Sequence, residues 1–230
     1  MGYTIRRMAV EDISQVSGID REAFPTEWPP PSFKRELNNP LIRYLVVLDD
    51  SVTPSGSTEV TEHKTNGTWG RLLSRVRHLL ATGHPPSNSS IPPDRKNIIG
   101  YAAIWLMVDE AHLTSIAVRK TNRRQGIGEL LLISIIKLAV QMKAEVVTLE
   151  TRVSNLEAQA LYDKYGFNRV GLRRRYYTDN SEDAVIMTTD KITSPSYQTR
   201  FRKLERNYIE RYGTAAMLTT PPLGQQTAWP

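Results

Sequence analysis

The sequence of 230 residues predicts a mixed α/β fold of the α+β kind, with a central sheet flanked by helices. The first observation behind this is the order of the elements, which lacks the regular alternation of a parallel βαβ protein. The second is a change of composition at residues 51–97 and after residue 190, where polar residues and proline interrupt the apolar patterns. We therefore expect one domain over residues 1–190 that contains a long insertion, followed by a C-terminal extension over 191–230.

The first fifty residues are predicted to hold a strand, two helices and a second strand. The strand covers residues 3–8, and apolar residues at helical spacing follow it. A proline-rich loop then breaks the chain, and Ser32 can cap a short second helix. The second strand covers residues 44–48.

The core is predicted to resume after the insertion with a β-hairpin. Ser154 starts a later helix, because Glu157 three residues on completes a capping box, and Gly166 ends that helix. The expected elements are strands at 98–107 and 112–118, a helix at 126–141, a strand at 146–152, a helix from Ser154 to Gly166, and strands at 167–170 and 184–188.

The insertion and the extension carry the excess of positive charge. Residues 51–97 have a net charge of +3 and residues 191–230 have +4, whereas the rest of the chain sums to −1. Residues 69–80 form an amphipathic stretch that either packs on the core or docks on a membrane surface or a partner. We expect the basic segments to contact RNA or a membrane surface. The extension is predicted to form a helix up to about Tyr212 and then a disordered tail.

The composition excludes several kinds of site. The chain has no cysteine, so disulfides, thiolate metal sites and thiol nucleophiles are absent. Its four histidines are scattered without metal-ligand spacing, and we expect no metal. No apolar run is long enough to span a membrane, and the N-terminus lacks the apolar stretch of a signal peptide. The expected localisation is cytoplasmic.

The turn that follows the strand Ile116–Val118 has the pattern of an anion site. Arg123, Gly126 and Gly128 are spaced Arg-x-x-Gly-x-Gly at the start of a long apolar helix. Glycine lets backbone N–H groups approach an anion, the helix end presents unpaired amides, and arginine adds donors suited to phosphate. The pattern is neither a dinucleotide fingerprint nor a P-loop. It predicts a pyrophosphate cradle, and an ordinary strand-to-helix turn is the alternative.

Two candidate acid–base residues follow this turn. Glu150 lies in an otherwise apolar strand, so its carboxylate is paired, faces solvent, or is a base with a raised pKa. Tyr162 lies two turns into the next helix, where it is a core aromatic or an acid beside the same cleft. Asn155 at the start of that helix could be only a helix cap. A carboxylate and a phenol beside one cleft suit acid–base chemistry on an amine and a thiolate.

Together these motifs resemble the GCN5-related N-acetyltransferase (GNAT) superfamily, and within it the RimI type, the ribosomal-protein-alanine N-acetyltransferases. The resemblance covers roughly residues 3–50 and 98–189 and leaves out the insertion and the extension. The matching stretches are Phe24-Pro-x-x-Trp28, Asp109-Glu-Ala111, Ile116-Ala-Val118, Arg123-x-x-Gly-x-Gly128, Glu150-x-Arg-x-Ser-Asn155, Ala160-Leu-Tyr162, Gly166-Phe167 and Arg174-x-Tyr-Tyr177.

The resemblance implies a GNAT fold with a mostly antiparallel sheet, acetyl-CoA as cosubstrate and a role for each motif. Glu150 would be the general base and Tyr162 the general acid toward the CoA thiolate. The implied cofactor-binding residues are Ile116, Ala117, Val118, Arg123, Arg124, Gln125, Gly126, Ile127, Gly128, Glu129 and Asn155. The implied acceptor-binding residues are Phe24, Trp28, Tyr176 and Tyr177.

The expected activity is transfer of an acetyl group to the N-terminal α-amine of a protein, a small-subunit ribosomal protein, by direct attack. The alternatives are an acetyltransferase for a small amine or a lysine side chain, and a docking protein that only binds acetyl-CoA. We expect a monomer that binds no DNA. Removal of residues 55–95 and 191–230 is expected to leave transfer to a free peptide intact.

Overall fold

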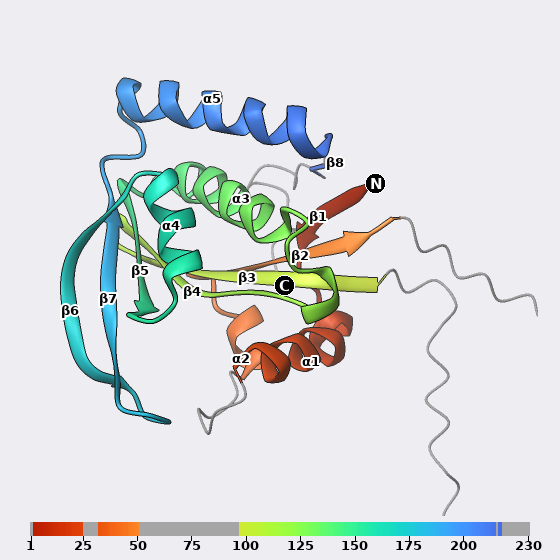
Figure 1. Ribbon diagram of the computed structural model, residues 1–230. Coiled ribbons are helices and arrows are strands. Elements are labelled where there is room, and N and C mark those ends of the chain that lie inside the picture. The colour runs from red at the N-terminus through yellow and green to blue at the C-terminus, as the bar shows by residue number, and fades with distance from the viewer. Residues whose placement is uncertain (1, 25–31, 51–96, 215, 218–230) are drawn as a thin grey trace, which may run out of the picture. The chain divides into compact units, whose positions relative to one another are not determined.

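The computed structural model describes residues 2–24, 32–50, 97–214 and 216–217. Within these ranges the chain folds around an eight-stranded sheet with the order β6-β7-β5-β4-β3-β2-β1-β8 (Figure 1). Neighbouring strands are antiparallel except for the pairs β4·β5 and β1·β8, which are parallel. The predicted fold class is therefore confirmed. Trp28, residues 51–96 of the insertion and most of the tail lie outside the described residues.

The elements follow the order that the sequence predicts, except that β8 lies in the tail, where we expected no strand. The strands are β1 (Tyr3–Arg7), β2 (Ile42–Asp49), β3 (Asn97–Met107), β4 (Glu110–Val118), β5 (Val146–Arg152), β6 (Phe167–Tyr177), β7 (Glu182–Thr189) and β8 (Ala216–Met217). The helices are α1 (Ile13–Ala23), α2 (Phe33–Leu37), α3 (Ile127–Gln141), α4 (Leu156–Lys164) and α5 (Pro195–Tyr212), with 3₁₀ turns at Val10–Asp12 and Lys120–Asn122.

The strand β6 is longer than the sequence predicts. We expected it to end at residue 170, before a basic, aromatic connection, but it runs to Tyr177 and pairs with β7 as far as Glu182. Residues 168–175 are all exposed, and the register shifts twice along the pair. A strand without a buried face has no apolar alternation, so the sequence carries no signal for it.

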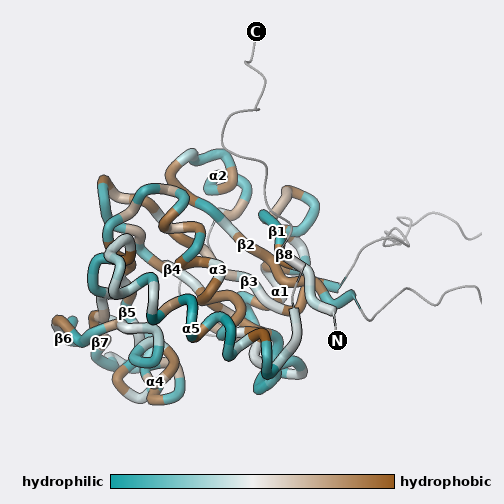
Figure 2. The backbone as a smooth tube through the Cα atoms, turned by 90° about the horizontal axis from the view of Figure 1, so that it is seen from above, coloured by the Kyte–Doolittle hydropathy of each residue, from teal (hydrophilic) through white to brown (hydrophobic). Residues whose placement is uncertain are grey.

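Two apolar cores lie on opposite faces of the sheet. The apolar residues of β3 are divided between them: Ile99 and Ile104 lie in the core with α3, whereas Ile98 and Tyr101 lie in the core with α1 and α2. A β-bulge at Ile99, where the register against β2 shifts, offsets the alternation of faces along the strand. Figure 2 shows apolar residues gathered where α3 lies over the centre of the sheet. No helix in the described ranges is long and apolar enough to cross a membrane.

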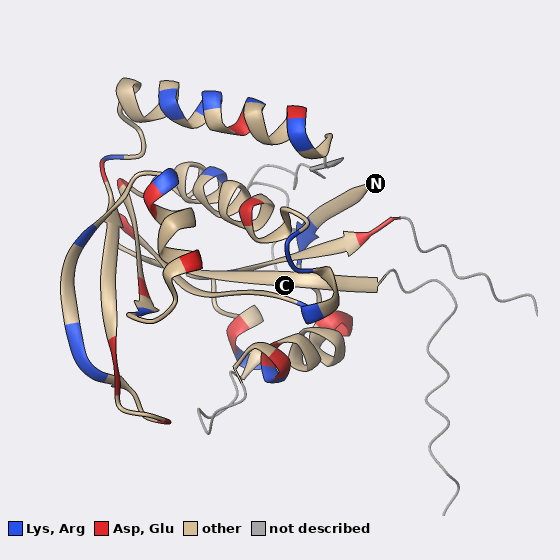
Figure 3. Cartoon of the chain, in the orientation of Figure 1, with Lys and Arg blue, Asp and Glu red and all other residues tan. Residues whose placement is uncertain are grey.

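The helix α5 packs on the outer side of α3, as Figure 1 shows, and belongs to the same core. Tyr197, Phe201 and Tyr208 are buried in that core, whereas the arginines and lysines of the helix are exposed. Figure 3 shows these basic residues in blue along α5. Burial of each such aromatic side chain contributes on the order of 1.5–3 kcal/mol. Removal of residues 191–230 would uncover one face of the core, so we expect it to lower stability, and the survival of transfer to a free peptide stays a prediction.

Candidate active site

The candidate site lies where the parallel strands β4 and β5 separate. Their pairing runs from Glu110, opposite Val146, to His112, opposite Thr148. Beyond this point β5 continues with β7, whereas β4 continues along β3 to Val118. No strand in the described residues pairs with the β5-side edge of β4 after His112. Backbone groups on that edge can therefore bond to a ligand.

The predicted ligand contacts at the end of β4 are limited to the backbone. Ala117 is 5% exposed and packs in the core with α1 and α2. Ile116 and Val118 are partly buried and pack in the core with α3. Since their side chains are used for packing, only their N–H and C=O groups are available to a ligand.

The turn between β4 and α3 has the backbone shape of an anion site. Gly126 has φ 79° and precedes the first turn of α3, and Arg124 also has a positive φ of 65°. The helix has no side-chain cap, and its first internal hydrogen bond runs from Leu130 N to Gly126 O at 2.9 Å. The amides of Ile127, Gly128 and Glu129 consequently have no partner within the helix, and a helix end of this kind attracts anions.

Three side chains of this turn are already used within the protein. Ile127 is 1% exposed in the core. The Glu129 carboxylate accepts hydrogen bonds from Lys164 Nζ at 2.5 Å and from the Tyr165 hydroxyl at 2.7 Å, which ties α3 to α4. Gln125 Oε1 accepts a hydrogen bond from the Tyr3 hydroxyl at 2.9 Å. Ile127 and Glu129 can therefore contribute to a ligand site mainly through their amides.

The two arginines of the turn remain at the surface. Arg123 Nε donates to the carbonyl oxygen of Val118 at 3.2 Å. Arg124 pairs with Glu157 at 2.9 Å, and the two side chains are 80% and 72% exposed. An ion pair so exposed contributes little to stability. The guanidinium of Arg124 can accordingly exchange Glu157 for a phosphate, which the arginine fork also suits.

Glu150 on β5 is held between two basic side chains. Its carboxylate is 6% exposed, with Oε2 2.7 Å from His112 Nε2 and Oε1 3.0 Å from an Arg173 guanidinium nitrogen. The hydrogen bond from His112 is the largest effect on the pKa of Glu150 and lowers it. Burial raises this pKa, whereas the electrostatic attraction of His112 and Arg173 lowers it further. The sequence left three possibilities for this carboxylate: that it is paired, that it faces solvent, or that it is a base with a raised pKa. The structure confirms that it is paired, and the expectation of a raised pKa is wrong.

Sequence reasoning missed His112 and Arg173. His112 stands opposite Thr148, two residues before Glu150 on the same face of β5. The sequence did show a polar residue in each of two predicted strands, His112 and Glu150. Their proximity could not be inferred without the register in which the two strands pair. Arg173 lies in the segment that we expected to be a connection.

Tyr162 is the most buried of the predicted catalytic residues. It projects from α4, is 5% exposed, and its ring lies 5.6 Å from that of Phe167. Burial raises the pKa of Tyr162, and the nearby Tyr177 raises it further. The phenol is therefore protonated at neutral pH, as a proton donor must be.

Tyr176 and Tyr177 at the end of β6 lie beside Glu150. Their rings are 5.2 Å apart, edge to face, and the charge of Glu150 raises the pKa of both phenols, after the larger effect of burial. The guanidinium of Arg152 lies 3.8 Å from the centre of the Tyr177 ring. Phe24 is 43% exposed at the end of α1. The structure thus brings Glu150, Tyr176, Tyr177 and Tyr162 together, and the expected contact of Phe24 with the acceptor stays a prediction.

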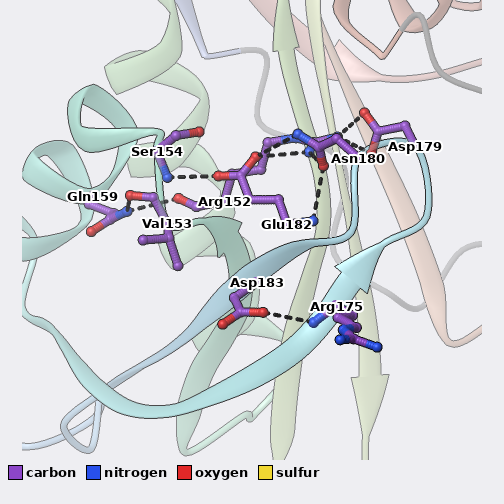
Figure 4. A network of polar contacts seen from close by, with 9 residues as sticks. All are labelled: Arg152, Val153, Ser154, Gln159, Arg175, Asp179, Asn180, Glu182 and Asp183. Atoms are coloured by element: carbon purple, nitrogen blue, oxygen red, sulfur yellow. Dashed lines mark hydrogen bonds and ion pairs between the residues drawn. The ribbon is translucent and has the colours of Figure 1, made fainter.

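A polar network holds the β6–β7 hairpin against the start of α4 (Figure 4). Arg152 binds Asp179 at 2.8 Å and Glu182 at 3.1 Å, and Glu182 accepts a hydrogen bond from Ser154 N at 2.8 Å. These hydrogen bonds, led by those from Ser154, lower the pKa of Glu182 to about 2. The network keeps Arg152 in place above Tyr177.

Asn155 is a helix cap in this structure. Its Oδ1 accepts a hydrogen bond from Ala158 N at 3.2 Å, at the start of α4. This is the plainer of its two interpretations, and its proposed contact with pantetheine stays a prediction. Within the described ranges, no three histidine, aspartate or glutamate side chains are arranged to hold a metal ion.

The comparisons with known proteins agree with this geometry. A model of the acetyltransferase (GNAT) family matches residues 59–167. The chain is 34% identical over 184 residues to a Bacillus subtilis protein provisionally named a ribosomal protein bS18-alanine N-acetyltransferase, covering 80% of this chain and 92% of the relative. It is 30% identical over 187 residues to an N-alpha-acetyltransferase of Saccharolobus solfataricus, covering 80% and 91%.

A solved structure shares the fold. The crystal structure of the ribosomal-protein-S18-alanine N-acetyltransferase from Escherichia coli matches with a TM-score of 0.57 at 24% identity, over 81% of this chain and 92% of that one. At this identity the likeness speaks for the fold alone.

Proposed function

The chain belongs to the GNAT family of acetyl-CoA-dependent N-acetyltransferases, to its RimI type, and on that premise we propose that it acetylates the N-terminal α-amine of a ribosomal protein. The observation that carries the proposal is the separation of β4 and β5. One strand leads to the anion-binding turn, and the other carries the ionised Glu150. A thioester and a base would thus meet between two neighbouring strands.

The residues of the turn suit acetyl-CoA. Gly126 in the left-handed conformation and the uncapped amides of residues 127–129 would hold the pyrophosphate, with Arg123 and Arg124 as additional donors. The free edge of β4 at Ile116–Val118 would bond to the pantetheine arm through its backbone. Acetyl-CoA supplies the thioester carbonyl, and the remaining chemistry is proton transfer by the chain.

Glu150 would accept the proton of the attacking amine. An α-amine has a pKa of about 8, so it is mostly protonated at neutral pH and must lose a proton. A carboxylate with a lowered pKa is a weak base toward a free ammonium ion. The ammonium ion would therefore lose its first proton to water, and the neutral fraction of the amine attacks. The nitrogen becomes far more acidic as its bond to the carbonyl carbon forms, and Glu150 would take the second proton at that stage. His112 Nε2 lies 2.7 Å from the Glu150 carboxylate, within hydrogen-bond reach of the proton that Glu150 would accept.

Tyr162 would protonate the departing sulfur. As the new C–N bond forms, negative charge grows on the carbonyl oxygen, and N–H groups on the free edge of β4 are suited to stabilise it. The C–S bond then breaks, and the thiolate takes the phenolic proton of Tyr162. Its pKa is raised by burial, so the phenol is protonated beforehand and regains its proton from solvent afterwards.

Tyr176 and Tyr177 would contact the acceptor. They stand beside Glu150, and the network of Arg152 keeps Tyr177 fixed. Flat aromatic faces next to a buried carboxylate suit the first residues of an extended peptide. The relatives' names make an N-terminal alanine, as in bS18, the first acceptor to test.

The test is acetyl transfer from acetyl-CoA by the full chain to a panel of short peptides. The panel holds peptides that begin with Ala, Ser, Met or Gly, the Ala peptide with a blocked N-terminus and an internal lysine, and a small polyamine. We expect transfer to free N-termini, fastest to Ala, and none to the blocked peptide. Transfer only to the lysine or the polyamine would replace the proposal by the small-amine or lysine alternative, and binding of acetyl-CoA without any transfer would favour a docking protein.

A further inference from the structure

The helix α5 touches two elements of the candidate site at once. Near its start, the Tyr197 hydroxyl donates to the carbonyl oxygen of Tyr165 at 2.9 Å, where α4 ends. The guanidinium of Arg200 fills the space beside Gly166, where a Cβ would lie 1.7 Å from one of its nitrogens. This half of α5 is therefore fitted to the helix that carries Tyr162.

The other end of α5 reaches the anion-binding turn. A Cβ on Gly126 would lie 2.9 Å from both Cε2 and Cζ of Tyr212, so the ring is packed against the backbone of this glycine. Tyr208 lies one turn earlier, and its ring centre is 5.0 Å from that of Tyr212. Burial raises the pKa of Tyr208, and the charge of the nearby Glu129 raises it further. Two tyrosines of α5 thus stand against the first turn of α3.

Hydrogen bonds also hold the chain next to Tyr212 and the chain next to Gly126. After Gly213, residues Ala216–Met217 pair in parallel with Thr4 and Ile5 of β1. The neighbouring Tyr3 donates its hydroxyl proton to Gln125, the residue before Gly126. The turn is therefore held from two directions, by Tyr3 through Gln125 and by Tyr212 through Gly126.

We propose that α5 is a brace for the cofactor site, and that Tyr212 is a positioning residue that fixes the conformation of the pyrophosphate turn. The proposal rests on the binding of acetyl-CoA at this turn. A residue with φ near +80° lies in a region that glycine leaves easily, because it has no Cβ to restrict it. The flat ring against Gly126 restricts that motion, so the amides of residues 127–129 are oriented before the pyrophosphate arrives. Preorganised donors bind more tightly because less freedom is lost on binding.

The brace would affect only the binding of the pyrophosphate, so its loss should change the affinity for CoA but not the affinity for pantetheine. The pyrophosphate belongs to the nucleotide half of CoA, whereas pantetheine would lie along β4. Loss of the Tyr212 ring should therefore weaken the binding of CoA and leave the binding of pantetheine almost unchanged. A general loss of folding would weaken both.

The experiment compares Tyr212→Ala with Tyr212→Phe and with Ile209→Ala in the full chain. Ile209 lies on the same helix and lines the small groove of about 180 Å³ between α3 and α5, and it is not among the atoms nearest to a Cβ at Gly126. The dissociation constants of CoA and of pantetheine are measured by calorimetry, together with the thermal midpoint of each variant. We expect Tyr212→Ala to raise the Kd of CoA about tenfold, the equivalent of about 1.4 kcal/mol. Tyr212→Phe and Ile209→Ala should stay within twofold of the parent chain.

The outcomes separate this inference from the proposed function. If the parent chain binds CoA and Tyr212→Ala binds it equally well, the brace is refuted and the proposed function stands. If the parent chain does not bind CoA, the proposed function fails first. If Tyr212→Ala does not fold, Tyr212→Leu takes its place, because leucine keeps apolar volume without the flat ring, and the same loss of CoA affinity is expected. Equal weakening of CoA and pantetheine would also refute the brace.

Discussion

The predicted anion-binding turn follows β4 and the carboxylate site lies on β5, and the two are built in different ways. The turn is defined by backbone: a left-handed Gly126, uncapped helix amides, and α5 packed behind it. The carboxylate site is defined by side chains from three strands, with Glu150 between His112 and Arg173. A change at the turn should therefore act through shape and on cosubstrate binding, whereas a change at the carboxylate should act through charge and on the chemical step.

The largest effect is expected at the carboxylate site, where a substitution should change the chemical step. Glu150→Gln keeps the shape of the side chain and removes the proposed base; a general base contributes about 10²–10⁴-fold in such reactions. We expect kcat to fall by that order while the Kd of acetyl-CoA stays unchanged, because the turn is on another element. Steady-state kinetics with an Ala-initiated peptide and calorimetry measure the two quantities.

A matched control for this substitution is Glu205→Gln. Glu205 is also an ion-paired glutamate, 2.6 Å from Lys137, but it lies between α5 and α3. It should leave kcat within about twofold, since ion pairs of this exposure contribute little. A Glu150→Gln enzyme that retains most of its kcat would show that Glu150 is not the base, and His112 would be the next residue to test.

The second effect is expected at the turn and is smaller. In Gly126→Ala the new Cβ meets the Tyr212 ring at 2.9 Å, and alanine in the left-handed region costs roughly 1–2 kcal/mol. We expect the Kd of CoA to rise about tenfold or more, with a lower thermal midpoint. Gly18→Ala in α1 is the control, because a Cβ there has nothing within 4 Å and Gly18 is not part of the turn. Equal effects of the two substitutions would contradict the assignment of the constraint to Gly126.

The two regions also differ in how far the sequence predicts them. The turn could be read from Arg123, Gly126 and Gly128, because a strand, a glycine turn and a helix are local in the chain. The partners of Glu150 could not be read, because His112 lies 38 positions away and its proximity depends on the register of β4 against β5. Local geometry is encoded in short patterns, whereas long-range pairing requires the fold.

The extension shows the same limit. Apolar positions in residues 197–208 predict a helix, but no pattern within that helix indicates which surface it covers. The contact of Tyr212 with Gly126 joins residues 86 positions apart. A segment that looked appended by composition is part of the core because three of its aromatic residues are buried there.

The smallest expected effect concerns the charge balance around Glu150. His112→Ala removes the hydrogen bond that does most to lower the pKa of Glu150, so we expect this pKa to rise; His112→Gln keeps an N–H donor and should raise it less. A carboxyl carbon titration by NMR measures the pKa directly. Because the carboxylate stays ionised at pH 7 in every variant, turnover at that pH should fall only a few-fold.

The sign of the matching stability change follows from the lowered pKa of Glu150. A carboxylate whose pKa is lower in the folded chain stabilises it above the unfolded value of about 4.3, and this contribution is lost as the pH falls through the folded value. The free energy of unfolding of the parent chain should therefore drop more between pH 5 and pH 3 than that of His112→Ala. If the two pH profiles are identical and the pKa of Glu150 is unchanged in His112→Ala, Arg173 alone holds the carboxylate ionised. The charge of Glu150 would then depend on β6 and not on β4, the strand that leads to the turn.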